Sequence, residues 1–288
     1  MRHHSTLIIG CDRSEESLSL AQKIAFTTAL TIASRLVQLR DRLLSRGARS
    51  RPVCPSIRQT RHTVRSGQNV LDAAYVEPAD APPAAALLIC HGIGEIVSQW
   101  FPIQRIFAEG RIASLVFDYS GYGRSTGHPD FLQLEQDAIS SFQLLQRLAP
   151  GTPISLLGFS LGSGIAPAIL NRVSPDRLIL CAPYTSFRSA ARAAWFPPFL
   201  SFLVPPIWSA REALCNCTLP ILIVQGDRDR LFQLQMAHDL LACTGGRADL
   251  LILPARSHNS PFYNPQPEYW NPIINWLQQP PSKPHPNS

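Results

Sequence analysis

The first strong pattern along the chain is helical. Apolar or small residues recur every three or four positions from 17 to 44, which predicts one long helix; they are Leu18, Ala21, Ala25, Thr28, Ile32, Leu36, Leu39 and Leu43. The part from 23 to 35 is apolar on most faces, but it is shorter than the roughly 20 residues that cross a bilayer, so a transmembrane helix is not expected. Three interpretations stay open: a helix docked on the following domain, a partner-binding helix, or a helix lying in a membrane interface.

Short apolar runs then alternate with helical patterns. The runs occupy 85–90, 113–117, 153–157, 178–182, 220–224 and 250–253, and the helical patterns lie at 103–108, 132–148, 161–172, 234–242 and 267–277. Ahead of them, 63–65 and 70–76 flank the turn residues 66–69 and predict a β-hairpin. Apolar strands separated by helices predict an α/β fold, with a mainly parallel central sheet and helices on both faces. The functional site of such a sheet lies at the carboxyl ends of its strands.

The pattern divides the chain into three parts. Residues 1–60 are expected to be a helical extension that ends in a linker from 46 to 61, residues 61–278 a single α/β domain, and residues 279–288 a disordered proline-rich tail. Within the domain, 187–218 interrupts the alternation with many aromatic residues and two proline pairs. This segment predicts a small lid or an acyl-binding wall, with ordinary packing over a sheet edge as the alternative.

Charge and cysteine content limit the partners and metal sites to be expected. The 288 residues carry 26 Lys and Arg against 20 Asp and Glu, a net charge of +6. The arginines crowd only between 35 and 65, which favours a solvated basic face over contact with an anionic membrane or partner. No nucleic-acid recognition motif accompanies them. Seven cysteines lack the paired spacing of a zinc site, and Cys90 and Cys181 lie in apolar runs and are expected to be small buried side chains.

These features indicate reduced thiols and a cytoplasmic protein. No secretory signal is recognised at the N-terminus, and neither a metal nor a cofactor is expected. Peripheral membrane contact through residues 17–46 remains an open prediction.

One pentapeptide carries the chemistry. Gly158-Phe159-Ser160-Leu161-Gly162 follows an apolar strand and opens a helical stretch. That context is what a nucleophile elbow requires, because the serine backbone is strained and the residues two before and two after it must be small. Ser160 is therefore the candidate nucleophile.

A serine nucleophile needs a base and an acid that orients the base. Of the three histidines after Ser160, only His258 follows directly on a predicted strand, so it is the candidate base. The strand 220–224 leads into Gly226-Asp227-Arg228-Asp229. Either carboxylate could serve as the acid, and Asp229 is favoured because it lies beyond the turn.

Acyl transfer also needs N–H donors for the oxyanion. The strand ending at Cys90 runs into His91-Gly92-Ile93-Gly94, a glycine-rich turn that can present backbone N–H groups. The N–H groups of Ile93 and Leu161 are the expected oxyanion pair. His91 itself is expected to brace the turn by hydrogen bonding.

Taken together, residues 63–277 resemble the α/β-hydrolase superfamily, whose motifs follow the same order. The segment from Asp118 to Ser125, Asp-Tyr-Ser-Gly-Tyr-Gly-Arg-Ser, is also similar to a segment of one branch of that superfamily. The branch contains serine-aminopeptidase-like hydrolases and α/β-hydrolase-domain proteins that act on fatty acyl thioesters. The resemblance implies an α/β-hydrolase fold with a leading hairpin and a small lid, and a structural role for Asp118.

The sequence thus predicts a serine hydrolase that cleaves carboxylic ester or thioester bonds through an acyl-enzyme. Its substrate would be a small-molecule or lipid-like acyl compound, and four aromatic residues are the candidate substrate-binding residues: Trp195, Phe196, Phe199 and Trp208. One alternative is an aminopeptidase or amidase with the same triad, although 187–218 offers only Glu212 to bind a free amino group. The other is a catalytically silent hydrolase fold used for binding.

Overall fold

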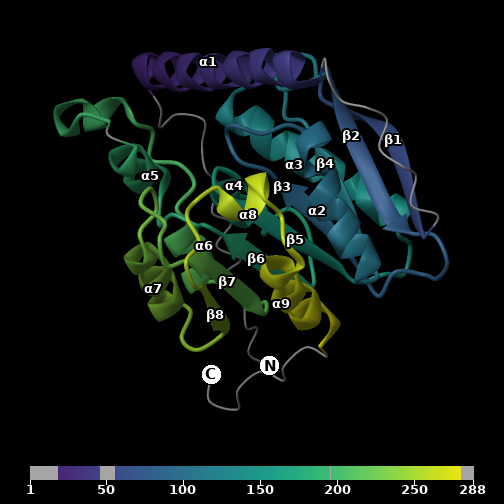
Figure 1. The fold of residues 1–288 in the computed structure, drawn as a ribbon. Coiled ribbons are helices and arrows are strands. Elements are labelled where there is room, and N and C mark those ends of the chain that lie inside the picture. Colours follow the sequence, from purple (N-terminus) through teal and green to yellow (C-terminus); the bar gives the residue numbers. More distant parts are fainter. Residues whose placement is uncertain (1–18, 46–55, 195, 280–288) are drawn as a thin grey trace, which may run out of the picture.

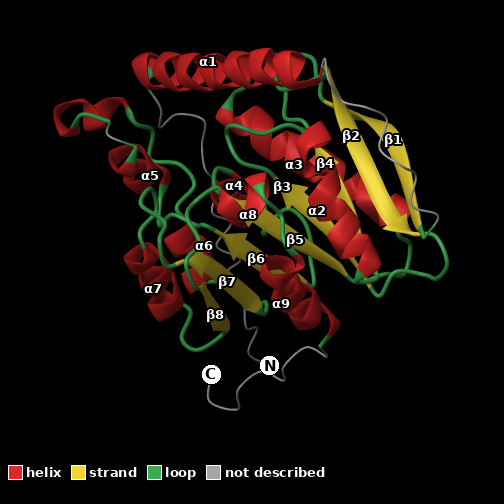
Figure 2. Cartoon of the chain, viewed as in Figure 1, coloured by secondary structure: helices red, strands yellow, loops and turns green. Residues whose placement is uncertain are grey.

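The computed structural model describes residues 19–45, 56–194 and 196–279, and it contains one mixed, mostly parallel sheet. In sheet order the strands are β1 (Ile57–Ser66), β2 (Asn69–Pro78), β4 (Ile112–Phe117), β3 (Ala85–Cys90), β5 (Ile154–Phe159), β6 (Arg177–Cys181), β7 (Ile221–Gly226) and β8 (Ala248–Leu253). β1 and β2 form an antiparallel hairpin, and β2 also pairs antiparallel with β4. Every other neighbouring pair is parallel (Figures 1 and 2).

Helices connect the parallel strands, as the alternation predicts. They are α1 (Leu20–Ser45), α2 (Val97–Glu109), α3 (Phe131–Leu148), α4 (Gly162–Ala168), α5 (Phe187–Ala193), the 3₁₀ helix η2 (Pro198–Leu203), α6 (Ala210–Cys215), α7 (Leu234–Cys243), α8 (Ser260–Tyr263) and α9 (Pro267–Gln278). α5, η2 and α6 all lie in the irregular segment between β6 and β7. The expected disordered tail falls almost wholly on residues 280–288, which lie outside the described residues.

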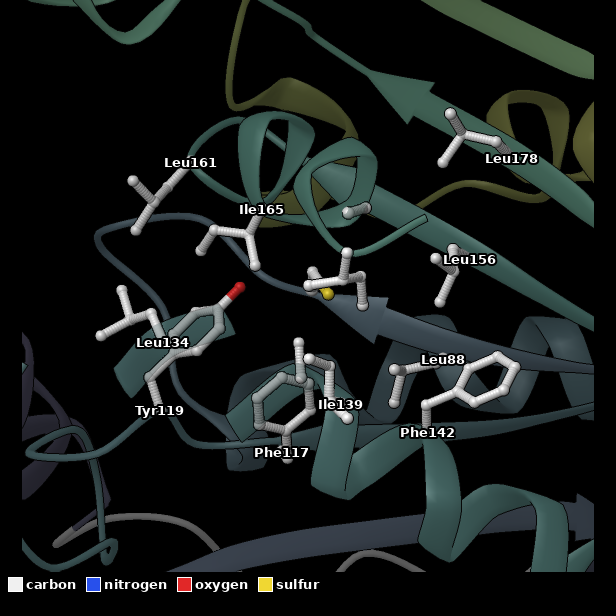
Figure 3. Close-up of a cluster of buried hydrophobic side chains, with 14 of the residues drawn as sticks. Leu88, Phe117, Tyr119, Leu134, Ile139, Phe142, Leu156, Leu161, Ile165 and Leu178 are labelled. Carbon is white, nitrogen blue, oxygen red and sulfur yellow. The ribbon is translucent and has the colours of Figure 1, made fainter. Parts of the chain in front are cut away.

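Two apolar cores explain why the central strands are apolar throughout. Alternate residues of a strand point to opposite faces, so Leu88 of β3 joins a core with α3, α4, α6 and α7. Its neighbours Leu87 and Ile89 join a second core with α2 and α9. Figure 3 shows part of the first core, where Phe142 of α3 lies close to Leu88. Helices on both faces therefore bury every side chain of β3.

The leading hairpin is longer than predicted, and the predicted linker is correspondingly too long. β1 begins at Ile57 and pairs with β2 as far as Pro78. Residues 58–61 are polar and exposed, so they carry no alternation of apolar and polar residues from which a strand could be recognised. Backbone pairing at the sheet edge, rather than burial, makes this stretch a strand.

The long N-terminal helix forms as expected, at Leu20–Ser45. It docks on the domain through Phe26, which is 4% exposed and packs edge-on against Phe131, Phe187 and Trp208. Phe131 begins α3 and Phe187 begins α5, so α1 lies beside the helices that follow β4 and β6. Among the described residues, no helix is both long and apolar enough to cross a membrane.

Candidate active site

Ser160 occupies a strained turn between β5 and α4. Its φ is 51°, a left-handed value that side-chain-bearing residues rarely adopt. A Cβ on Gly162 would lie 1.9 Å from the carbonyl oxygen of Cys90, and one on Gly158 would lie 2.3 Å from the carbonyl oxygen of Gly162. The turn is therefore possible only with glycine at both positions, as its sequence indicates. The backbone N–H of Ser160 also donates to the Cys181 carbonyl at 3.0 Å.

His258 lies in the loop between β8 and α8. The Arg256 carbonyl accepts from the Arg228 N–H at 3.0 Å, and a Cβ on Gly226 would lie only 2.2 Å from that same oxygen. This close approach joins the His258 loop to the turn after β7. The imidazole packs edge-on against Phe232, with ring centroids 5.0 Å apart.

Asp229 is the most firmly held side chain of the group. Its Oδ2 lies 2.7 Å from His258 Nδ1 and accepts from Gln225 Nε2 at 3.0 Å. Its Oδ1 accepts from the N–H groups of Leu231 and Phe232 at 2.8 and 2.9 Å. Its side chain is 1% exposed, against 10% for His258.

The structure brings the three polar residues selected from the sequence into one hydrogen-bonded chain. Ser160 Oγ lies 2.9 Å from His258 Nε2, and His258 Nδ1 faces Asp229. Asp227, the other carboxylate that the sequence allowed, is exposed and takes no part in it. Such a chain can move a proton from the hydroxyl to the imidazole while the carboxylate orients the ring.

The expected oxyanion donors follow two adjacent strands: Leu161 directly follows Ser160 after β5, and Ile93 lies in the turn after β3, which pairs with β5. Within the described part of the molecule, no acceptor is bonded to the N–H of Ile93 or of Leu161. The Gly92 N–H is different, because it donates to Glu95 Oε2 at 2.8 Å. Glu95 Oε2 also accepts from the Trp100 indole at 3.0 Å, so a buried carboxylate fixes the turn that carries Ile93.

His91 is fully buried and braces its own turn. Its Nδ1 lies 2.8 Å from the Gly92 carbonyl, which matches the structural role expected for it. Burial lowers the pKa of His91 to about 4, because the charged ring is poorly solvated there. His91 is therefore neutral at pH 7.

Asp118 also has a structural role. Its carboxylate accepts from the backbone N–H groups of Val97 and Arg124 at 2.7 and 3.2 Å, linking the start of α2 to the loop after β4. Burial raises the pKa of Asp118 to about 7, although these two N–H bonds favour the ionised form. Cys90 and Cys181 are completely buried, as expected.

Three of the four candidate substrate-binding residues lie in the described part of the chain, and they differ in exposure. Trp208 corrects the sequence prediction: it is 1% exposed, packs on Phe26, and donates its indole N–H to Glu135 at 3.0 Å. Phe199 is 77% exposed on η2, Phe196 is partly buried, and Trp195 lies outside the described residues. The sequence of an aromatic segment interrupted by proline pairs does not reveal which of its rings face the core.

Two supporting residues were not selected from the sequence. Gln225 holds Asp229, and Glu95 holds Gly92, yet each is an ordinary polar residue next to a motif. The sequence shows only an acidic residue three positions after Gly92, and its burial and its bond to the Gly92 N–H are known from the structure alone. No cluster of three or more metal-binding side chains occurs among the residues that the structure describes.

The chain is similar to known protein families over part of its length. A family model described as serine aminopeptidase, S33, matches residues 81–216. The lysophosphatidylserine lipase ABHD12 of Macaca fascicularis is 29% identical over 161 residues, covering 50% of this chain and 38% of that protein. The chain therefore spans well under half of this relative's length.

Solved structures share the fold. The esterase Pf2001 of Pyrococcus furiosus superposes with a TM-score of 0.61 at 15% identity, covering 80% of this chain and 94% of that one. A thermostable carboxyl esterase of Bacillus coagulans, solved with glycerol, gives a TM-score of 0.61 at 17% identity and covers 77% and 98%. At these identities the likeness concerns the fold alone, and it confirms the sheet, hairpin and flanking helices expected from the sequence.

Proposed function

The chain belongs to the α/β-hydrolase superfamily, and from that premise we propose that it is a serine hydrolase cleaving carboxylic esters through an acyl-enzyme. The observation that carries the proposal is the continuous contact from Ser160 through His258 to Asp229. A surface serine without function has no need of a strained backbone, a partnered imidazole and a buried carboxylate.

The reaction follows from the positions of these groups. His258 Nε2 takes the proton as Ser160 Oγ attacks the carbonyl carbon, and Asp229 stabilises the imidazolium that forms. The N–H groups of Ile93 and Leu161 donate to the oxyanion. His258 then protonates the leaving alcohol, which departs as the acyl-enzyme forms.

Hydrolysis repeats these steps with water. His258 removes a proton from the water that attacks the acyl carbonyl, and returns that proton to Ser160 Oγ as the free acid leaves. No step requires a cofactor. The loss of one oxyanion donor typically costs about 3 to 4 kcal/mol of transition-state stabilisation.

We assign the substrate to lipid-like or other apolar acyl compounds. The relative named above is a lipase by name, and the segment 187–218 is largely apolar, with Phe196 and Phe199 as its accessible described candidates for contact with an acyl chain. Each buried methylene would contribute up to about 0.8 kcal/mol. We therefore expect kcat/KM to rise from acetyl to medium-chain p-nitrophenyl esters, and a flat or falling series would remove the acyl-contact proposal.

Thioesters and amides are the two competing bond types. The matching family model is named for an aminopeptidase, but Glu212, the acidic residue of 187–218, is exposed on α6. Parallel assays with an aryl ester, a thioester and an aminoacyl-naphthylamide separate the three, with Ser160→Ala as the control. We expect the aryl ester to give the highest kcat/KM, and a protein that turns over none of them would fit the silent binding fold instead.

A further inference from the structure

Two neighbouring segments expose most of the large apolar side chains found on the described surface. Seven of the twelve exposed large apolar residues lie on α1 and η2, and each is between 55% and 77% exposed. They are Leu20, Ile24, Ile32, Leu36 and Leu39 of α1, and Phe199 and Phe202 of η2. We call this set the α1–η2 surface. Isolated apolar residues are normal on a protein surface, but a contiguous group marks an interaction site.

The exposed side of α1 is opposite its docked side. Successive helix residues turn by about 100°, which places the buried Gln22, Phe26 and Leu30 on one side. Four of the exposed apolar residues of α1 lie about 120° to 160° around the helix from Phe26, and Leu36 lies about 80° from it, at the edge of the docked side. The helix therefore has two apolar faces, of which only one is used by the domain.

α1 and η2 are held together. The Gln22 side chain donates to the Phe202 carbonyl at 2.6 Å, so Phe202 lies against the N-terminal turns of α1. Figure 1 shows α1 along one side of the molecule, beside the segment that carries α5 and η2. The two segments form one surface rather than two separate groups of apolar residues.

Charge identifies what this surface fits. The sequence of α1 contains four basic residues and one acidic residue, an excess of three. This one helix therefore carries half of the net charge of the chain, which is +6. An apolar helix face combined with local positive charge is the chemistry that binds an anionic lipid surface.

Position relates the surface to the candidate active site. Phe26 anchors α1 on the first residues of α3 and α5, which follow the carboxyl ends of β4 and β6. Ser160, Asp229 and His258 also follow carboxyl ends, those of β5, β7 and β8. A lipid surface bound to α1 would lie on the same side of the sheet as the reacting serine.

We propose that the α1–η2 surface docks on anionic phospholipid, with α1 lying in the interface and not crossing it. This inference rests on the proposed function and adds to it the membrane surface on which the enzyme binds its lipid-like ester. It does not depend on the triad, because binding can be measured without turnover.

Vesicle flotation of the full chain tests the proposal. With the Ser160→Ala chain, which cannot hydrolyse the lipid, we expect at least about tenfold stronger partitioning into phosphatidylcholine vesicles that contain phosphatidylglycerol than into phosphatidylcholine alone. High salt should reduce this preference. The double variant Ile24→Glu/Leu36→Glu should lose about tenfold or more of the binding. The matched variant Ile252→Glu, at an exposed apolar site on β8, should keep it.

Activity on a soluble ester separates this proposal from the proposed function. The double variant, made in the chain that retains Ser160, should hydrolyse p-nitrophenyl acetate as the unaltered chain does, which also shows that it is folded. Absent vesicle binding, or equal binding by the double variant, would overturn the lipid proposal and leave the hydrolase proposal standing. Light scattering tests the other possible occupant of the surface, a second copy of the chain. If the unaltered chain is a dimer and the double variant is a monomer, the surface is a dimer interface and the lipid proposal is contradicted.

Discussion

The turn around Ser160 and the segment from α5 to α6 both follow strands at the same edge of the sheet, yet they are built in opposite ways. Around Ser160 the polar side chains are buried and hydrogen-bonded, and the glycines have backbone atoms in contact where a side chain would be. In the other segment, Phe199 and Phe202 point into solvent and Trp208 fills the core. The polar side chains around Ser160 are thus fixed by buried hydrogen bonds, whereas the segment from α5 to α6 leaves two large aromatic rings exposed.

The two carboxylates after β7 give the largest test of this difference. Asp229→Asn should lower kcat by about ten-thousandfold, because the amide no longer selects the productive tautomer of His258. Asp227→Asn is the matched control, since Asp227 is exposed in the same turn. Steady-state assays with an aryl ester measure both, and similar losses in the two variants would contradict the assignment.

Two aromatic residues of the segment from α5 to α6, Trp208 and Phe199, should differ in their effect on stability. Trp208→Ala removes a buried ring and its bond to Glu135, so we expect the free energy of unfolding to fall by about 3 to 5 kcal/mol. Phe199→Ala should leave it within about 0.5 kcal/mol, because that ring is exposed. Denaturant titration measures the free energy of unfolding of both variants. A strongly destabilised Phe199 variant would show that this ring packs in the folded core and is not exposed.

Glu95 tests whether support of the oxyanion turn affects the reaction. Glu95→Ala removes the acceptor for the Gly92 N–H, and misplacement of the adjacent Ile93 N–H should lower kcat about a hundredfold with little change in KM. Glu109→Ala, on the exposed end of α2, should leave kcat unchanged. A rise in KM alone would instead indicate a role in ground-state binding.

His91 gives a smaller effect that depends on pH. Its folded pKa of about 4 lies below the ordinary value of 6.5, so between these values the unfolded chain binds more protons and stability falls as pH falls. From pH 7 to pH 5 the unaltered chain should lose about 2 kcal/mol more than His91→Gln does. Parallel unfolding curves at both pH values measure this difference, and equal losses would mean that His91 is not buried neutral.

Chain order explains how much of the site could be predicted. Ser160, Asp229 and His258 each follow an apolar strand, and parallel strands bring such positions to one edge, so their meeting follows from the pattern alone. Glu95 accepts from a backbone N–H three residues before it, and Gln225 donates to the Asp229 carboxylate four residues after it. Neither spacing is part of a recognised motif, so neither contact could be predicted. The strand from Ile57 was missed because both of its sides are largely exposed, and the burial of Trp208 depends on Phe26 of the distant α1.

The central claim is that Ser160 is the nucleophile, and covalent labelling with a fluorophosphonate tests it most directly. The reagent should label the unaltered chain, and mass spectrometry of its peptides should place the adduct on Ser160. Ser160→Ala should not be labelled. An unlabelled wild-type chain, or undiminished labelling of Ser160→Ala, would contradict the account.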